Sequence, residues 1–363
     1  MSTDTRRIVI TGTGRSIPGV VVSNDRFLDN EFFMDYGQPV ESGDNDSVID
    51  KFRQITDIRE RRYAEDDRVT SDLATEAAEA AVADAGVDRE ALDYIVVAHN
   101  FGDVAAANRY PELLPSLAAR VKQNLAIGNP SCIAYDLPFG CPGWVQGVIQ
   151  CSYFLSSGDA NRALVIGAET LSRVSDPHDR DSMIYSDGAG AAVLEVRENA
   201  EPVGVLSHAM RSDTLDHARL LWMGPSYNRD HEPDRLFVKM HGRKLYEYAL
   251  NHVPGLVRES LDKAGLDLAD VSKVFLHQAN AKMDEAIVRR LFRLYKLRNA
   301  DVASVMPMSI ATLGNSSVAT VPTLLDLVVK GELDDHEVHP GDVIVLASVG
   351  AGMNVNSIVY RWV

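Results

Sequence analysis

Three cysteines lie within twenty residues of one another, and one of them stands in a setting that favours nucleophilic chemistry. Cys141 directly precedes Pro142 and an apolar segment that is predicted to be a helix as far as about Leu155. Proline is favoured at the first helical position, so Cys141 is expected at or near the N-cap. The N–H groups and macrodipole of a helix start favour a thiolate, which would lower the pKa of Cys141 and make it a nucleophile. We interpret Cys132 and Cys151 as buried and unreactive, as free cysteines usually are.

Two further polar positions follow strand-like or precede helix-like segments. His277 comes directly after the apolar residues 274–276 and is expected at the end of a buried strand, which favours it modestly over the other nine histidines. Asn315 lies in the small polar turn 314–317, before a predicted helix at 318–329. An asparagine in that place can simply be a helix N-cap. Position alone therefore leaves a structural role open for both residues.

An internal duplication predicts the elements that position these side chains. The motif A-G-V-D at 85–88 leads to an apolar run at 94–97, and A-G-L-D at 264–267 leads to another at 273–276, 179 positions later. The same offset relates the apolar runs 163–166 and 342–345. Helical periodicity at 71–85 and 242–264 alternates with such runs. The sequence therefore predicts two similar α/β halves, residues 1–195 and 196–363, with the site where strand ends and helix starts of the two halves converge.

Composition excludes several classes of partner. A net charge of −16 disfavours DNA, RNA and anionic membranes, because phosphate binding needs net or clustered positive charge. The first residues contain no apolar stretch of the length of a secretion signal or membrane span, so a cytoplasmic location is expected. The three clustered cysteines give neither a disulfide framework nor metal-ligand spacing, so no metal site is expected.

Taken together, the motifs resemble the signature set of the beta-ketoacyl-acyl-carrier-protein synthase III group of the thiolase superfamily. The matching segments, in chain order, are I-R-E-R-R at 58–62, S-D-L-A at 71–74, the cysteine motif at 136–144, L-V-I-G-A-E at 164–169, S-R at 172–173, D-P-H-D-R at 176–180, S-D-G-A-G-A-A-V-L at 186–194, M-H-G-R at 240–243, H-Q-A-N at 277–280, G-N-S-S at 314–317 and V-G-A-G at 349–352. The resemblance implies a thiolase-like α/β fold, in which the duplicated halves form a five-layered α-β-α-β-α arrangement, and a homodimer.

The resemblance also implies a catalytic triad of Cys141 in the N-terminal half with His277 and Asn315 in the C-terminal half. A thiolase would carry a second cysteine near its C-terminus, and none follows Cys151. Elongating synthases have a second histidine where Asn315 stands. Chalcone-synthase-like enzymes share the Cys-His-Asn set, so the triad alone does not separate them from synthase III.

The implied reaction is a decarboxylative Claisen condensation in fatty-acid or polyketide-like biosynthesis. Cys141 would accept an acyl group from a thioester, with the oxyanion held by the backbone N–H groups of Cys141 and Ala351. His277 and Asn315 would donate hydrogen bonds to the carbonyl of a malonyl-type or beta-ketoacyl carrier-protein thioester, whose enolate attacks the acyl-cysteine. No cofactor is implied beyond the thioester substrates on coenzyme A or carrier-protein phosphopantetheine.

A basic cluster after the histidine suggests a protein partner. It consists of Lys282, Arg289, Arg290, Arg293, Lys296 and Arg298, opposed in that stretch only by Asp284 and Glu285. The resemblance implies that an acidic acyl carrier protein docks on Lys282, Arg289 and Arg290, with electrostatics acting mainly on orientation and association rate. The alternative is an ordinary solvated helix face.

The chain departs from the family pattern on the coenzyme A side. A tryptophan and an arginine that help hold the nucleotide are replaced by Lys51 and Ile55, whereas Arg180 is kept. Priming from acetyl-CoA is therefore disfavoured, and an acyl group from a carrier protein or another coenzyme A ester is expected. Leu114 stands where a pocket residue reaches across the dimer, in a segment (100–115) that looks longer than its equivalent. Both features suggest a non-acetyl acyl pocket.

Two other functions fit the same scaffold. One is an acyltransferase that moves the acyl group from Cys141 to a hydroxyl or amine without decarboxylation. The other is a non-catalytic partner subunit. Asn315 argues against the first, because simple transfer needs no second enolate donor, and the complete triad argues against the second.

Overall fold

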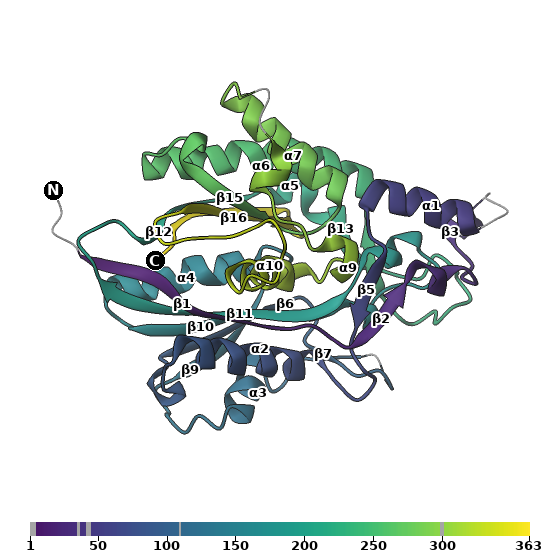
Figure 1. Cartoon of the computed structure of the whole chain (residues 1–363). Coiled ribbons are helices and arrows are strands. Elements are labelled where there is room, and N and C mark those ends of the chain that lie inside the picture. Colours follow the sequence, from purple (N-terminus) through teal and green to yellow (C-terminus); the bar gives the residue numbers. More distant parts are fainter. Residues whose placement is uncertain (1–4, 35–36, 41–44, 109, 298–300) are drawn as a thin grey trace.

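Two stacked β-sheets organise the chain (Figure 1). The computed structural model describes residues 5–34, 37–40, 45–108, 110–297 and 301–363. The first sheet has the order β1 (Arg6–Ser16), β11 (Asp187–Glu198), β10 (Arg162–Thr170), β6 (Tyr94–His99) and β9 (Ile133–Pro138). β1, β11 and β10 pair antiparallel, whereas β10, β6 and β9 pair parallel.

The second sheet repeats four of these five strands. Its order is β12 (Gly204–Ser212), β17 (Asn354–Arg361), β16 (Val343–Gly350) and β15 (Val271–Leu276). β12, β17 and β16 pair antiparallel, and β16 and β15 pair parallel. This matches the directions of β1, β11, β10 and β6, so the predicted duplication is confirmed in the topology. The division of the chain at residue 195 stays a prediction.

Helices occupy three levels around the two sheets (Figure 1). The middle level holds α4 (Gly143–Ser157) and α10 (Thr320–Val329), the first outer level α2 (Thr70–Ala85) and α3 (Leu117–Asn124), and the second outer level α6 (Gly242–Ala264) and α7 (Ala281–Leu294). α4 contacts strands of both sheets, and so does α10. The predicted five-layered thiolase-like fold is therefore confirmed.

Small residues allow α2 to lie close to the first sheet. The helix presents a buried alanine face that includes Ala77 and Ala81. A methyl group on Gly12 of β1 would lie 2.3 Å from the backbone nitrogen of Ala85, and one on Gly14 would lie 2.4 Å from the Ala77 carbonyl oxygen. These two positions therefore need glycine, because any side chain there would push the helix off the sheet.

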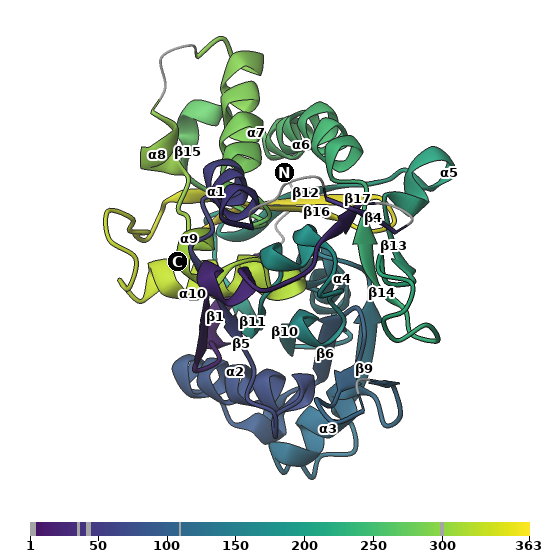
Figure 2. The same ribbon diagram turned by 90° about the vertical axis from the view of Figure 1, so that its right-hand side faces the viewer.

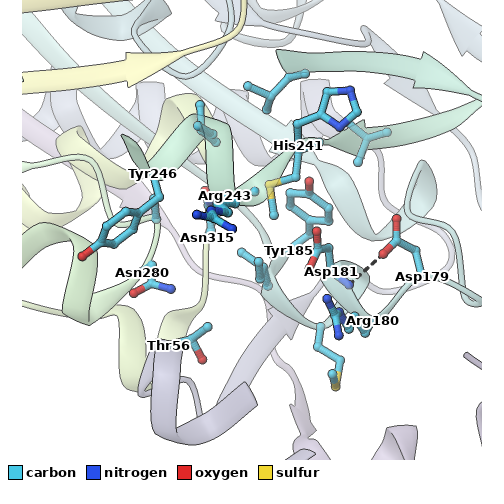
Figure 3. A pocket seen from close by; sticks show the side chains of 18 of the residues that line it. Thr56, Asp179, Arg180, Asp181, Tyr185, His241, Arg243, Tyr246, Asn280 and Asn315 are labelled. Atoms are coloured by element: carbon cyan, nitrogen blue, oxygen red, sulfur yellow. Dashed lines mark hydrogen bonds between the residues drawn. The ribbon is translucent and has the colours of Figure 1, made fainter. Parts of the chain in front are cut away.

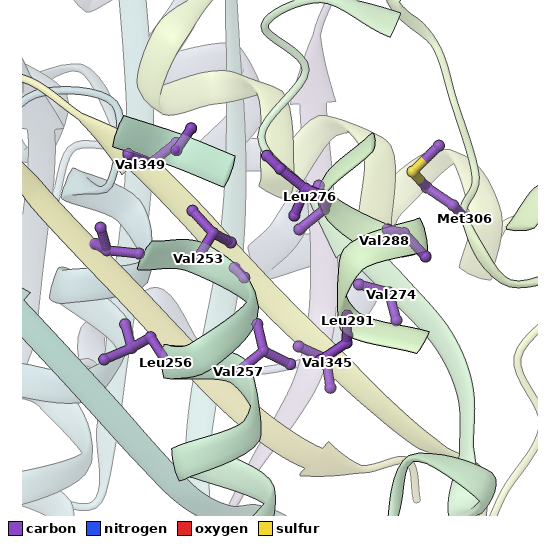
Figure 4. Packing of buried hydrophobic residues seen from close by; sticks show 14 of the residues in the cluster. Val253, Leu256, Val257, Val274, Leu276, Val288, Leu291, Met306, Val345 and Val349 are labelled. Atoms are coloured by element: carbon purple, nitrogen blue, oxygen red, sulfur yellow. The ribbon is translucent and has the colours of Figure 1, made fainter. Parts of the chain in front are cut away.

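A separate hydrophobic core fixes the strand that precedes His277. Val253 and Val257 of α6 and Leu291 of α7 pack against Val274 of β15 and Val345 of β16 (Figure 4). Burying each such side chain is worth about 1.5–3 kcal/mol, so the end of β15 is firmly anchored.

Smaller elements close one end of the molecule above the site. Helix α1 (Asn45–Thr56) lies beside α7, and the hairpin of β13 (Leu221–Gly224) and β14 (Phe237–Met240) leads directly into α6 (Figure 2). Among the described residues, no helix combines the length and the apolar character that a membrane crossing requires.

Candidate active site

The three predicted triad residues line one cavity of about 1140 Å³. Cys141 precedes α4, His277 follows β15, and Asn315 lies between a short helix (Ile310–Leu313) and the 3₁₀ helix Ser317–Ala319. Figure 3 looks into this cavity, with Asn315 among its labelled side chains. The fold thus brings together residues that are 136 and 38 positions apart in the sequence.

Cys141 lies near the N-cap of α4, as predicted. Pro142 is the N-cap of α4, and Cys141 immediately precedes it and is half-buried. Burial raises the pKa of the Cys141 thiol to about 11, against a hydrogen bond from the Ser317 hydroxyl, while the Glu169 carboxylate raises it further. The predicted lowering of this pKa is therefore wrong, because desolvation and a nearby carboxylate outweigh the helix start. Cys132 and Cys151 are buried, as predicted.

His277 is fixed and uncharged. Its backbone N–H donates to the Ala347 carbonyl of β16 over 2.9 Å, and only 5 % of the residue is exposed. Burial lowers the pKa of the imidazole to about 4, so the ring is neutral at physiological pH. Thr320, the first residue of α10, lies with its Oγ1 2.7 Å from Nδ1 of the ring.

The Thr320 hydroxyl can pair with His277 in either tautomer of the ring. Its Oγ1 also lies 3.0 Å from the Ser317 carbonyl, to which it can only donate. In that orientation Nδ1–H of His277 donates to Oγ1, and Nε2 is a proton acceptor. If the hydroxyl turns to the ring and donates to Nδ1, the proton stands on Nε2 and makes it a donor. One hydroxyl therefore serves both tautomers.

Asn315 is held at both its backbone and its side chain. Its N–H donates to the Ile184 carbonyl over 3.0 Å, and its carbonyl accepts from the N–H of Ser186 over 2.9 Å. Oδ1 accepts from the N–H of Ser317 over 2.7 Å, which leaves the NH₂ as the end that can donate to a ligand. The alternative of an N-cap is wrong, because the N-cap of α10 is Ala319 and makes no side-chain cap.

Two backbone segments abut at the cavity wall beside the thiol. A methyl group on Gly350 would lie 2.7 Å from the backbone nitrogen of Cys141, and one on Gly140 would lie 3.0 Å from that of Ala351. Gly140 also has φ +74°, which favours glycine. Cys141 and Ala351 both line the cavity, and the role of their N–H groups as oxyanion donors stays a prediction.

Several cationic side chains line the same cavity as the thiol. Lys51 and Ile55 of α1 belong to the lining, as do Arg180, Arg243 and Lys244. Figure 3 labels Arg180 and Arg243. The structure thus places both the retained Arg180 and the two departures from the family pattern at the same cavity.

A buried ion-pair cluster supports the turn that carries Arg180. Lys239 of β14 is 1 % exposed and pairs with Asp176 and with Asp179, the latter at 3.2 Å. Oδ1 of Asp179 also accepts from the N–H of Asp181 over 3.0 Å (Figure 3). The cluster therefore fixes the start of the 3₁₀ helix Arg180–Ile184.

Two predicted binding elements lie outside the cavity. Leu114 is 89 % exposed and does not line the cavity of its own chain, so its predicted role across a dimer stays a prediction. Lys282, Arg289 and Arg290 are exposed on α7, with Arg293 and Lys296 further along, and Arg289 pairs with Glu285. Arg298, the last member of the predicted cluster, lies outside the described residues.

Sequence reasoning missed four polar residues around the triad. They are Asn100, Glu169, Ser317 and Thr320. Ser317 belongs to the G-N-S-S motif and Thr320 follows one helical turn later, so their proximity to Asn315 could have been noticed. The contact of Ser317 with Cys141 and the contact of Thr320 with His277 each join segments that are distant in the sequence.

Comparisons with known proteins identify the family. Residues 135–214 match the family described as 3-oxoacyl-[acyl-carrier-protein (ACP)] synthase III, and residues 261–362 match its C-terminal part. The beta-ketoacyl-[acyl-carrier-protein] synthase III of Dinoroseobacter shibae is 31 % identical over 98 % of this chain and 99 % of its own. That of Rhodobacter capsulatus is 32 % identical over 99 % and 100 %. The chain belongs to the beta-ketoacyl-acyl-carrier-protein synthase III family. It is therefore an enzyme, of a family whose members carry the predicted fold.

Solved structures agree with this family. The 3-oxoacyl-[acyl-carrier-protein] synthase III of Aquifex aeolicus superposes with a TM-score of 0.78 at 27 % identity, covering 98 % of this chain and 100 % of its own. The priming beta-ketosynthase of the R1128 polyketide pathway superposes with a TM-score of 0.80 at 25 % identity, covering 100 % and 98 %. The structures that this chain resembles thus include both a synthase III and a priming ketosynthase of a polyketide pathway.

Proposed function

We propose that this synthase III family enzyme catalyses a decarboxylative Claisen condensation through Cys141, His277 and Asn315. The convergence of these three side chains, from three separate elements, on one cavity carries the proposal. The proposed product is a beta-ketoacyl thioester on a carrier protein.

The first step loads an acyl group onto Cys141. With a pKa of about 11 the thiol is protonated at neutral pH and needs a base. Neutral His277, with its proton on Nδ1 towards Thr320, offers Nε2 as that base. Sγ then attacks the thioester carbonyl, the oxyanion is stabilised by the N–H groups of Cys141 and Ala351, and the donor thiol leaves with the proton.

The second step forms the new carbon–carbon bond. The Asn315 NH₂ and the Nε2–H tautomer of His277 donate hydrogen bonds to the carbonyl of a malonyl-type thioester. Cleavage of the carboxylate bond releases carbon dioxide and leaves an enolate, whose charge these two donors stabilise. The enolate carbon attacks the acyl-cysteine, and the Cys141 thiolate leaves.

The proposed chemistry needs no metal or other cofactor. The thioester supplies the leaving group, and loss of carbon dioxide supplies the electron pair for the new bond. A beta-ketoacyl or malonyl-type group on phosphopantetheine would reach the triad along the cavity.

We propose that both substrates arrive on thioester arms, with an acyl carrier protein docking on α7. The curated relatives carry that protein in their names. Asn280 and Met283, at the start of α7, line the cavity, and Lys282 between them is exposed, so an arm could enter beside the basic face. Because the cations Lys51, Arg180 and Arg243 also line the cavity, acyl-coenzyme A is proposed as a second acyl donor.

The acyl pocket is proposed to hold a group larger than acetyl. Apolar side chains that include Phe33, Leu171, Met183 and Val238 line the cavity. Such a lining suits an aliphatic chain better than a two-carbon group. A homodimer, with Leu114 reaching the partner's cavity, completes the proposal.

Acyl-enzyme formation and carbon dioxide release together test the reaction. The protein is incubated with a panel of acyl-coenzyme A and acyl-carrier-protein donors, and acylated Cys141 is detected by intact mass. Malonyl-carrier protein is then added, and carbon dioxide is measured. Acylation followed by carbon dioxide release supports condensation, whereas acylation with transfer to a hydroxyl or amine and no carbon dioxide would replace it with simple acyl transfer.

A further inference from the structure

A chain of partly buried hydrogen bonds runs from Sγ of Cys141 to a carboxyl group that the proposed reaction does not use. The Ser317 hydroxyl donates to Sγ over 3.2 Å, and Nδ2 of Asn100 donates to Oγ of Ser317 over 3.1 Å. The same Nδ2 and the backbone N–H of Asn100 donate to Oε1 of Glu169, over 2.6 and 2.5 Å. Glu169 stands near the end of β10 and is 1 % exposed.

The chemistry of an amide sets the direction of these hydrogen bonds. An amide NH₂ carries two hydrogens and donates only. Asn100 gives one hydrogen to the Glu169 carboxylate and the other to Ser317, so Oγ of Ser317 accepts from Asn100. The single hydroxyl proton of Ser317 is therefore available for Sγ.

The backbone of Ser317 is fixed in a conformation that aims its hydroxyl. Its φ of +53° lies in the left-handed region, which side chains other than glycine, asparagine and aspartate seldom adopt. Its N–H donates to Oδ1 of Asn315, and its carbonyl accepts from Thr320. Contacts with Asn315 of the triad and with Thr320 beside it thus hold Ser317 in this strained position.

We propose that Ser317 is a catalytic hydrogen-bond donor to the Cys141 nucleophile, and that Asn100, anchored on Glu169, is the positioning residue that aims it. The inference rests on the proposed function, in which Cys141 carries the acyl group. Negative charge develops on Sγ when the thiol proton leaves, and again when the thiolate departs after condensation. A hydroxyl already aimed at sulfur stabilises the thiolate more than the neutral thiol.

Three other titratable side chains lie near the sulfur. They are Glu169 of β10, Tyr185 before β11 and His277 after β15. Burial raises the pKa of Glu169 to about 7, and its carboxylate opposes the thiolate above that pH. Burial keeps Tyr185 protonated and His277 neutral, because it raises the pKa of the first and lowers that of the second. Removal of Ser317 leaves all three groups in place.

Alkylation of the full-length protein tests the donor. The rate of Cys141 modification by iodoacetamide is measured by intact mass from pH 7.5 to 10.5, without substrate. Ser317→Ala and Ser317→Gly are expected to react about tenfold more slowly, or slower still, at each pH, because a hydrogen bond to a charged group is lost. Glycine suits the left-handed φ, so it separates the lost hydroxyl from backbone strain. Ser316→Ala, the neighbouring serine outside this network, is expected to react at the wild-type rate.

A double variant tests the positioning role of Asn100. Asn100→Ala alone is expected to slow alkylation less than Ser317→Ala, and to add nothing in a Ser317→Ala background. Wild-type rates in both Ser317 variants would overturn the donor, and a further decrease in the double variant would overturn the relay. Acyl loading distinguishes this inference from the proposed function. If wild type loads Cys141 while Ser317→Ala alkylates normally, only the inference fails, but loading of Cys141→Ala would remove the proposed function itself.

Discussion

Replacing Thr320 with valine tests the hydroxyl that serves both tautomers of His277. Valine keeps the shape of threonine but offers no partner to Nδ1, which lies 2.7 Å from Oγ1 in a buried site. A buried polar group left without a partner costs roughly 1–3 kcal/mol. If this cost falls on the transition states, it corresponds to roughly a 5- to 150-fold loss in rate. We expect both acylation and decarboxylation to slow by a factor in this range, since each step needs a defined imidazole tautomer.

Single-turnover measurements follow acyl-enzyme by intact mass and carbon dioxide release separately. Thr320→Ser restores the hydroxyl and should recover most of both rates. Thr323→Val is the matched control, because Thr323 is buried one turn further along α10, and its hydroxyl faces the Ala189 carbonyl at 3.4 Å. The reasoning is refuted if Thr320→Val keeps wild-type rates for both steps, or if Thr323→Val slows them as much.

Three further predictions concern the other parts of the site. Asn315→Ala should keep acylation but slow condensation by about two to three orders of magnitude, as loss of one oxyanion donor does, and equal loss of both steps would make Asn315 structural. Reversing both Arg289 and Arg290 to glutamate should raise the KM for carrier-protein substrates at low salt and leave a small pantetheine thioester unaffected, whereas unchanged carrier-protein kinetics would make α7 a solvated face. Burial lowers the pKa of His277 from 6.5 to about 4, so the unfolded chain binds an extra proton between these values and stability falls as the pH drops through that window. His277→Gln should remove up to about 3 kcal/mol of this acid sensitivity in urea unfolding, and an unaltered pH dependence would contradict it.

Local periodicity was sufficient to predict the scaffold of the site. The helix expected at 242–264 is α6 (Gly242–Ala264), and that expected at 71–85 is α2 (Thr70–Ala85). His277 follows β15 as predicted, because a short apolar run before a polar residue indicates a buried strand end. These features depend on residues close together in the sequence, so they can be recognised without a structure.

The protonation states of the site could not be predicted in the same way. The helix start beside Cys141 predicted a lowered pKa, but burial and the Glu169 carboxylate of β10 raise it, despite a hydrogen bond from Ser317, 176 positions away. The contact between His277 and Thr320 spans 43 positions. The N-cap alternative for Asn315 failed because the chain turns at Ser317, with a positive φ, before α10 begins. Each of these facts depends on tertiary contacts and burial.

The most direct test of the account is the identity of the acylated residue. Wild type, Cys141→Ala, Cys132→Ala and Cys151→Ala are incubated with an acyl donor that loads the wild-type enzyme, and acyl-enzyme is measured by intact mass. Only Cys141 lines the cavity with His277 and Asn315, whereas Cys132 and Cys151 are buried elsewhere. The account predicts that Cys141→Ala alone loses the acyl group. Retained acyl-enzyme in Cys141→Ala, or its loss in either of the other two variants with a preserved fold, would contradict it.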